Sequence, residues 1–275
     1  MLTAMRAEII GEPKLQTIKN PKTSDDLLVA NVLLGYQKEE GGNKTFVPAV
    51  AWAEKAENLA QKKSGDVIEF AGTLSGTDYK HPSMEKPRRE LCFTINAIDE
   101  SQTICQKLEE YMGVVRREQD KPGAVFQPVR GKLFEDPVLA TVEGKDGKPL
   151  EVCNATLRHW DGVKGHPDTL VAISAFGNEA KALSEMKKGY PIQFVGRLDS
   201  RIYKNENMDK GHAELCFNVY SIDPERKLAK NANNFIQEEM GLKPKLKDKI
   251  YAAEQRITAN AGAKDVKEMA AEPVR

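Results

Sequence analysis

The order of apolar and polar positions along the chain predicts strands interrupted by a short helix. The two-residue period of half-buried strands occurs in residues 5–18, 27–37, 45–52, 66–75 and 90–98. Residues 54–63 instead have helical spacing, and Gly65 is expected to cap the C-terminal end of this helix. The predicted order is therefore three strands, one helix and two strands.

The same pattern occurs twice, at an offset of 124 residues. The repeated segments include Glu90-Leu91-Cys92-Phe93 with Glu214-Leu215-Cys216-Phe217, and Gly72-Thr73-Leu74 with Gly196-Arg197-Leu198. No gap is needed from Pro13 to Asp99, and the identities over that span far exceed those expected from composition. Each copy spans about 95 residues, which suits a small domain with its own core. The chain is therefore read as a duplicated domain.

A five-stranded barrel with its helix between the third and fourth strands is the OB-fold. We therefore predict a mainly β protein with helices: two tandem OB-fold five-stranded barrels, each followed by an amphipathic helix. A pair of α+β sandwiches is the alternative topology. Gly11 and Gly131 suit the bend that a first strand makes in closing such a barrel.

Four segments are expected along the chain. They are a first OB-fold domain at 1–100, a helical connector at 101–125, a second OB-fold domain at 126–224 and a helical, Lys-rich C-terminal extension at 225–275. Helical spacing over 101–117 and 227–240 places a helix after each barrel, packed on its own barrel or between subunits. A further helix is expected at 247–260.

Composition excludes several classes of protein. The 41 basic and 41 acidic residues balance, so no net field attracts nucleic acid. The four cysteines form no C-x-x-C pair and the four histidines supply no ligand spacing, so neither structural zinc, a disulfide framework nor a cofactor is expected. Cys92 and Cys216, each followed by phenylalanine, are interpreted as small buried hydrophobic residues.

Location and catalysis are also constrained. No apolar run reaches the roughly 18 to 20 residues of a membrane span, and the N-terminus has no secretory signal, so we expect a cytoplasmic protein with no membrane partner. A nuclease or other enzyme is not supported, because no paired-carboxylate or His/Asp arrangement recurs in both copies and no glycine loop would hold a phosphate.

Segments at the centre of each copy resemble bacterial-type single-stranded DNA-binding proteins. The resemblance rests on residues 51–59 and 65–74, and more closely on 175–183 and 188–198. There an aromatic residue and a glycine precede the helix, Lys-Gly precedes the fourth strand, and Gly-x-Leu lies within it. The match covers both predicted barrels in tandem. The chain ends in Pro273-Val274-Arg275 and lacks the acidic C-terminal tip with which that family recruits enzymes.

The resemblance implies aromatic side chains that stack on bases, because every base has a π-face. The implied positions are Trp52 and Phe176 closing the third strand, Phe46 six residues earlier, Tyr79 and Tyr203 after Gly-x-Leu, and Tyr36 and Trp160 near the end of the second strand. The second copy has Leu170 in place of Phe46. The alternative is that Trp52 and Phe176 belong to the core, where Phe70, Phe93, Phe194 and Phe217 are expected.

Basic residues near these aromatic positions are expected to neutralise phosphates. They are Lys80, Lys86, Arg88 and Arg89 in the first copy, and Arg158, Arg197, Arg201, Lys204 and Lys210 in the second. The alternative is that these charges only keep the loops solvated.

The expected function is sequence-nonspecific binding and protection of single-stranded DNA in DNA replication, recombination or DNA transfer. The expected partners are single-stranded DNA, further copies of the chain in a homo-oligomer, and replication or recombination proteins. Because the copies differ at the stacking positions, we expect unequal affinities for DNA. The alternative is a protein-interaction scaffold of a replication or DNA-transfer complex with weak nucleic-acid affinity.

Overall fold

The computed structural model describes residues 2–19, 24–37, 44–79, 88–115, 125–144, 146–159, 168–203 and 212–242. The first copy contains β1 (Leu2–Lys19), β2 (Asp26–Gln37), β3 (Lys44–Trp52), α1 (Glu54–Ala60), β4 (Val67–Tyr79) and β5 (Arg88–Asp99), followed by α2 (Ile104–Tyr111). The second contains β6 (Phe126–Leu133), β7 (Val138–Glu143), β8 (Pro149–His159), β9 (Thr169–Phe176), α3 (Asn178–Ser184), β10 (Pro191–Tyr203) and β11 (His212–Ile222), followed by α4 (Leu228–Glu239). The predicted order of three strands, one helix and two strands is confirmed in the first copy; in the second copy four strands, β6 to β9, precede α3 and two follow it.

Both copies close into barrels, which confirms the predicted OB-folds and excludes the α+β alternative. In the first copy the strands close in the order β1-β2-β3-β5-β4. In the second the sheet order is β6-β10-β11-β9-β8-β7, and an additional pairing of β6 with β8 joins the two sides of the ring. In the second copy β7 pairs with β8, and in the first copy the second half of β1, from Lys14 to Lys19, pairs with β2 in the same way.

Two glycines serve this closure in different ways. Gly11 has a φ of 74° and lies in the register shift of β1 between Ile10 and Lys14, where a left-handed residue bends the strand. Gly131 lies where β6 approaches β8, and a Cβ there would be 3.0 Å from the Arg158 carbonyl oxygen. The absence of a side chain therefore allows the two strands of the second barrel to meet.

The offset between the copies is not constant, which corrects the ungapped alignment. Val29 pairs with Trp52 in the first copy and Val152 with Phe176 in the second, so β3 and β9 correspond at 124 residues but β2 and β8 at 123. A shorter connection before β8 is compensated by a longer one after it, so the sequence shows no net gap. Tyr36 therefore corresponds to His159, which pairs with Thr169 as Tyr36 pairs with Thr45, and not to Trp160.

The helix between the third and fourth strands is shorter than predicted. α1 ends at Ala60, where its last turn tightens as the Gln61 N–H donates to the Asn58 carbonyl. Gly65, expected as its cap, lies four residues beyond Gln61, and its N–H donates to the Ile9 carbonyl at 2.8 Å. Its φ of 92° serves the turn into β4 instead of the helix end.

The barrel interiors are filled by the residues predicted for them. Phe70, Phe93, Phe194 and Phe217 are completely buried. Phe70 and Phe93 meet edge to face, with ring centroids 5.8 Å apart. All four cysteines are free and buried, which confirms the interpretation of Cys92 and Cys216.

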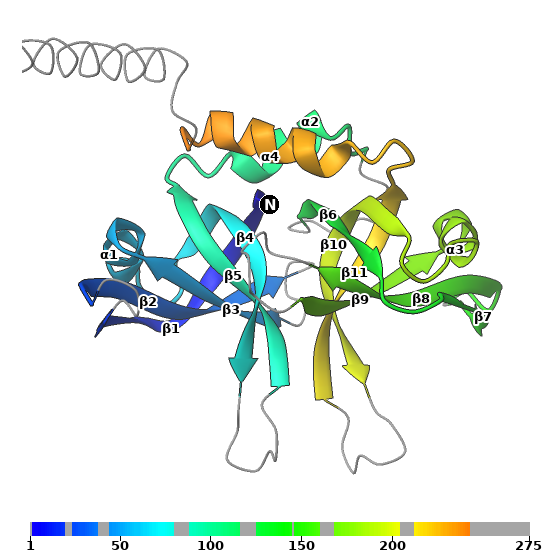
Figure 1. Cartoon of the computed structure of the whole chain (residues 1–275), viewed down its shortest axis with the longest axis horizontal. Helices are drawn as coiled ribbons and strands as arrows, with labels where there is room; N and C mark the ends of the chain where they lie inside the picture. Colours follow the sequence, from blue (N-terminus) through cyan, green and yellow to red (C-terminus); the bar gives the residue numbers. More distant parts are fainter. Residues whose placement is uncertain are drawn as a thin grey trace, which may run out of the picture.

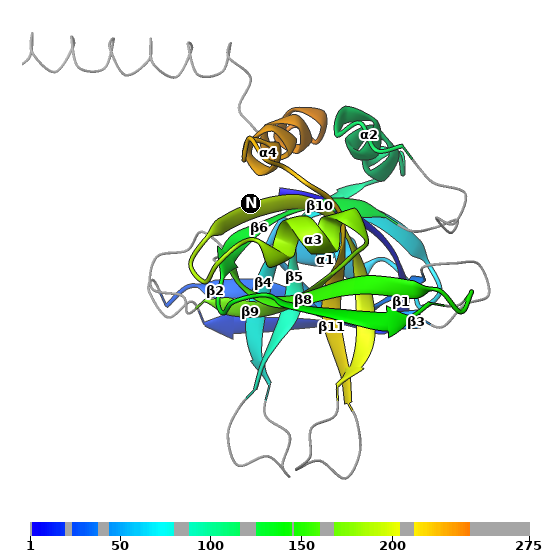
Figure 2. The same ribbon diagram turned by 90° about the vertical axis from the view of Figure 1, so that its right-hand side faces the viewer.

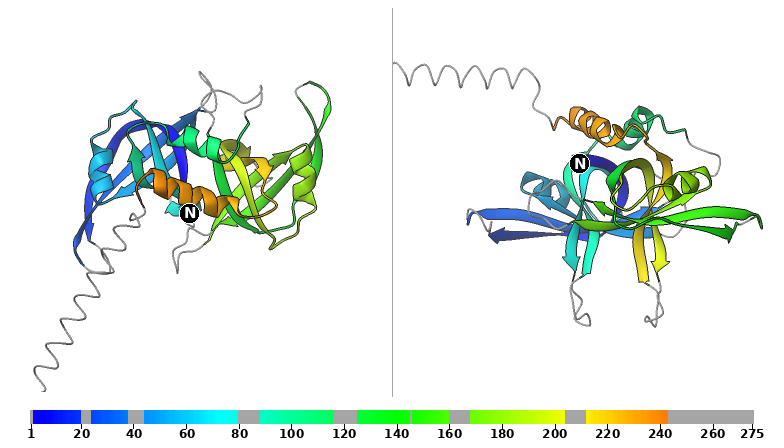
Figure 3. Two further views of the ribbon diagram at one scale, coloured as in Figure 1. Left: turned by 90° about the horizontal axis from the view of Figure 1, so that it is seen from above. Right: turned by 45° about the vertical axis from the view of Figure 1, so that its right-hand side comes forward.

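Helices α2 and α4 form one layer over both barrels, on the side opposite to the β4–β5 and β10–β11 hairpins (Figure 1, Figure 2). Each helix contacts both β1 and β6, so it lies on the neighbouring barrel as well as its own. Seen from above, the layer crosses the junction between the barrels (Figure 3). In the described part of the chain, no helix has the length and apolar character needed to cross a membrane.

The two helices are attached by equivalent hydrogen bonds. The Phe126 N–H donates to Glu109 Oε1 on α2 at 3.0 Å, and the Leu2 N–H donates to Asn233 Oδ1 on α4 at 2.9 Å. These donors and acceptors correspond at the offset of 124 residues, so each first strand is bound by the helix of the other copy. The arrangement is a pseudo-two-fold pair within one chain.

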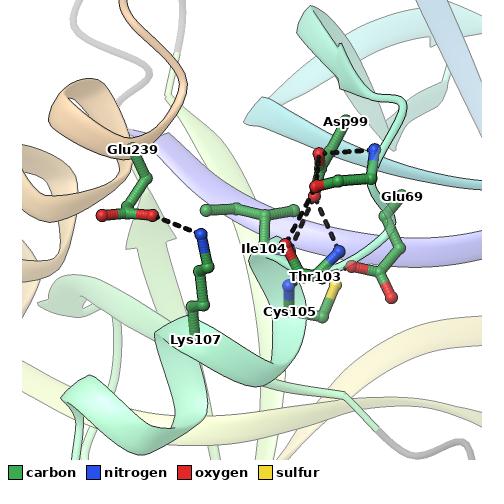
Figure 4. Close-up of polar contacts among 8 residues, drawn as sticks. Glu69, Asp99, Thr103, Ile104, Cys105, Lys107 and Glu239 are labelled. Atoms are coloured by element: carbon green, nitrogen blue, oxygen red, sulfur yellow. Dashed lines mark hydrogen bonds and ion pairs between the residues drawn. The ribbon is translucent and has the colours of Figure 1, made fainter.

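The start of α2 is fixed by carboxylates from its own barrel (Figure 4). Asp99 accepts hydrogen bonds from the Thr103 and Ile104 N–H groups at 2.8 Å, and Glu69 accepts from the Cys105 N–H at 3.0 Å. Burial raises the pKa of Asp99, but these bonds and those from Ser101 outweigh it and the net shift is downward. An ion pair between Lys107 and Glu239, 2.7 Å apart, joins α2 to α4.

Candidate nucleic-acid interface

The outer face of β2 and β3 in the first barrel carries exposed apolar side chains. Along β3 the side chains alternate: Val47 and Ala51 are completely buried, whereas Phe46 is 52% and Trp52 38% exposed. On β2, Leu33 lies on the same outer face and is 41% exposed. The rings of Phe46 and Trp52 thus lie on a single sheet surface, six residues or about 20 Å apart along the strand.

The equivalent face of the second barrel is more polar. Phe176 and Leu170 are exposed at the positions of Trp52 and Phe46. Between them on β8 and β9, the Ser174 hydroxyl donates to Asn154 Oδ1 at 2.7 Å. The alternative that Trp52 and Phe176 belong to the core is wrong, because the smaller Ala51 and Ala175 occupy the inward positions.

Tyr36 does not lie on this face, which corrects its predicted role. Its side chain is 1% exposed, and its hydroxyl accepts a hydrogen bond from the Val125 N–H, just before β6, at 3.1 Å. Burial raises the pKa of Tyr36 to about 12. The ring is used in the contact between the barrels and is closed to a base.

His159, the equivalent of Tyr36, is also buried between the barrels. Its Nδ1 lies 3.0 Å from the Arg130 carbonyl oxygen and its Nε2 3.0 Å from the Leu74 carbonyl oxygen in the first barrel. Burial lowers the pKa of His159, against the opposing effect of these carbonyls.

The described cations occupy two different places. Arg158 is exposed on β8, with Nε 3.4 Å from Asp168 Oδ2 and its guanidinium 5.3 Å from the centre of the Phe134 ring. Arg197 on β10 is half-buried, and its charge lowers the pKa of Tyr36. Arg197 therefore lies within β10, beside the contact between the barrels, and not in a loop as predicted.

The remaining predicted residues that the structure describes belong to the β4–β5 and β10–β11 hairpins. Tyr79 ends β4 opposite Arg88, and Tyr203 ends β10 opposite His212, so their backbones lie at the far ends of the two hairpins (Figure 1). In the strand register, the backbone of Arg89 lies opposite that of Asp78, and the backbone of Arg201 lies opposite that of Glu214. Lys80, Lys86, Trp160, Lys204 and Lys210 lie outside the described residues.

Leu33 was not predicted as a site residue. It stands between Val32 and Leu34 on β2, so the alternating pattern puts its side chain on the other face of the strand from theirs. Within the described ranges, no group of three or more His, Cys, Asp or Glu side chains is arranged to hold a metal ion.

Comparison with known proteins gives structural likeness only. No protein-family model matches the chain, and no curated protein matches it in sequence. The wild-type single-stranded DNA-binding protein of Thermus aquaticus is similar in structure, with a TM-score of 0.53, 16% identity, and coverage of 82% of this chain and 93% of that one. A deletion mutant of the same protein matches with a TM-score of 0.52, 15% identity, and coverage of 82% and 97%. At this identity the likeness concerns the fold.

Proposed function

We propose that the chain binds single-stranded DNA without sequence preference, through the outer faces of β2–β3 and β8–β9. The observation that carries this proposal is the exposure of Trp52 and Phe176 at equivalent ends of the third strands of both barrels. Large rings that point out of an alternating strand can stack on unpaired bases, and stacking contributes about 1 to 3 kcal/mol per base without reading sequence.

The surroundings of these rings support the same function. Phe46 and Leu33 extend the apolar surface along the first barrel, and an exposed apolar patch marks an interaction surface. Arg158 lies beside Leu170 on the second face, where a guanidinium can neutralise a phosphate. The hairpin residues Tyr79 and Tyr203 are proposed as further stacking positions on the resemblance already described.

Tryptophan fluorescence tests the proposal, because the chain has two tryptophans. In a W160F variant, Trp52 is the remaining reporter. Titration with an oligo-dT strand at two salt concentrations should quench Trp52, and binding should weaken at higher salt as counterions are released. Y190A is the control for the loss of an exposed aromatic ring, because Tyr190 is exposed to a similar degree as Trp52 but lies outside both outer faces. It should leave the affinity unchanged.

Absence of both binding and quenching at micromolar protein would overturn the proposal and favour the scaffold alternative. The process that DNA binding serves, whether replication, recombination or DNA transfer, stays a prediction. Self-association also stays a prediction, and light scattering with and without oligo-dT measures it.

A further inference from the structure

We propose that a cavity of the second barrel, where β8 and β10 flank β6, binds a phosphate group of the DNA strand. This inference rests on the proposed function and adds a site to it. The cavity has a volume of about 480 Å³ and is lined by residues that include Arg130, Lys132, Arg158, Asp168 and Gln193. That volume lies within the range of about 300 to 1,000 Å³ typical of ligand sites.

Strand register brings the cations together. Lys132 on β6 pairs directly with Arg158 on β8, and Arg158 pairs in turn with Leu170 on β9. Directly paired residues point to the same side of a sheet, so these three side chains form one row on the outer face. The row leads from the cavity onto the face that carries Leu170 and Phe176. A DNA strand whose bases stack on that face therefore passes the cavity.

Charge in the cavity favours an anion. Among the described residues that line it, Arg130, Lys132 and Arg158 are cations and Asp168 is a carboxylate. Cations on paired strands repel each other, and an anion between them relieves the repulsion. Arg158 meets Asp168 through Nε at 3.4 Å, with a side chain that is 52% exposed. Guanidinium groups bind phosphate with two parallel hydrogen bonds, and a lysine adds a compact positive charge.

The equivalent corner of the first barrel is neutral. Glu8 stands at the position of Lys132, Gly35 at that of Arg158 and Lys44 at that of Asp168. The Lys44 ammonium donates to both oxygens of Glu8 at 2.7 Å. Arg6, equivalent to Arg130, lies 3.9 Å from Glu69, which replaces Gln193. In the first barrel the two cations thus form ion pairs with the two carboxylates. The proposed phosphate site is therefore present in the second copy and not at the equivalent place in the first.

The test compares two variants that each lose two positive charges. R130Q/K132Q removes cations of the cavity, and K63Q/K230Q removes exposed cations from the turn after α1 and from α4. Each is titrated with oligo-dT and with an abasic strand, which has the phosphates but no bases, over a series of salt concentrations. Thermal unfolding verifies that both variants fold.

For R130Q/K132Q, the slope of log Kobs against log salt concentration should become less negative by about 0.7 with either strand, since each phosphate that is no longer neutralised removes about 0.7 for single strands. Identical slopes for the two variants would overturn the cavity proposal while leaving strand binding intact. A wild-type chain that binds the abasic strand as tightly as oligo-dT would instead overturn base stacking, while a less negative slope in R130Q/K132Q would still support the cavity. A wild-type chain that binds neither strand would overturn both.

Discussion

Tyr111 on α2 and Phe235 on α4 stack with ring centroids 4.4 Å apart and planes 15° apart. The two residues are 124 positions apart, so each is the counterpart of the other in the duplicated sequence. A contact between equivalent residues lies on the pseudo-two-fold axis, as in the isologous interface of a symmetric dimer. The helices after the barrels therefore hold the two copies together.

The first prediction is that this ring pair stabilises the folded chain. A double-mutant cycle of Y111A and F235A should give a coupling of about 0.5 to 1.5 kcal/mol, the usual contribution of an aromatic pair beyond its buried area. Urea unfolding of the four chains measures it. If the free energy of unfolding lost in the double variant equals the sum of the losses in the two single variants, the rings do not interact directly.

The second prediction concerns the difference between the two outer faces. W52A and F46A should each weaken oligo-dT binding by about 1 to 3 kcal/mol, the contribution of one stacked base. L170F, which restores to β9 the ring that β3 has in Phe46, should strengthen binding, because Leu170 is already half exposed. Fluorescence anisotropy with labelled oligo-dT gives the affinities. Unchanged binding in L170F would mean that the strand does not cross that part of β9.

The third prediction concerns the hairpin ends. Y79A/Y203A should unfold at the wild-type temperature but bind oligo-dT more weakly by about 1 to 3 kcal/mol for each base that loses a stacking partner. T77A/D78A, which changes residues of β4 next to Tyr79, is the control for disturbance of the hairpin. If both variants bind as wild type does, the hairpin tyrosines are wrongly assigned.

The strand order and the duplication could be predicted because both depend on local patterns. Alternation placed Val32 and Leu34 on one face of the second strand and Leu33 on the other, and in the structure the first two are buried and Leu33 is exposed. The repeated Gly-x-Leu and Leu-Cys-Phe segments located the fourth and fifth strands in both copies. Each of these signals lies within one strand and needs no knowledge of its neighbours.

The errors arose where distant segments meet. The two-residue period of β2 puts Tyr36 on the buried face with Leu34, and only the family resemblance assigned Tyr36 to a base; the partner of its hydroxyl, the Val125 N–H at the entrance to the second barrel, is not visible in that pattern. The shift between β2 and β8 is concealed because its two length changes cancel. The pairing of Lys132 with Arg158 depends on closure of the second ring and could not be predicted from local sequence.

The fourth prediction is that acid weakens the contact between the barrels through His159. Because the pKa of His159 is lowered in the folded chain, the unfolded chain binds this proton first as the pH falls. The free energy of unfolding should therefore decrease below about pH 6.5, by at most about 1.4 kcal/mol per pH unit for one group. Stability is retained above that pH.

Urea unfolding at pH 7.5 and 5.5 checks this effect in the wild type and in H159Q. Glutamine keeps a donor for one of the two carbonyls but does not titrate, so H159Q should be less stable at pH 7.5 and show a smaller loss on acidification. The other three histidines are the same in both chains. Equal pH dependence in the two chains would show that His159 does not carry the effect.

The fifth prediction follows from the residue before each short helix. Ala53 before α1 has φ 53° and ψ −133°, and its equivalent before α3, Gly177, has φ 59° and ψ −124°. This backbone region is essentially restricted to glycine and costs another residue about 1 to 3 kcal/mol. Glycine also loses more entropy on folding, by about 0.5 to 1 kcal/mol relative to alanine.

A53G should therefore stabilise the chain by about 0.5 to 2 kcal/mol, and G177A should destabilise it by a similar amount. Because a Cβ at Gly177 would meet nothing within 4 Å, the loss in G177A would come from the backbone and not from a clash. Urea unfolding of both variants measures the two changes, and a destabilised A53G would show that Ala53 is not strained.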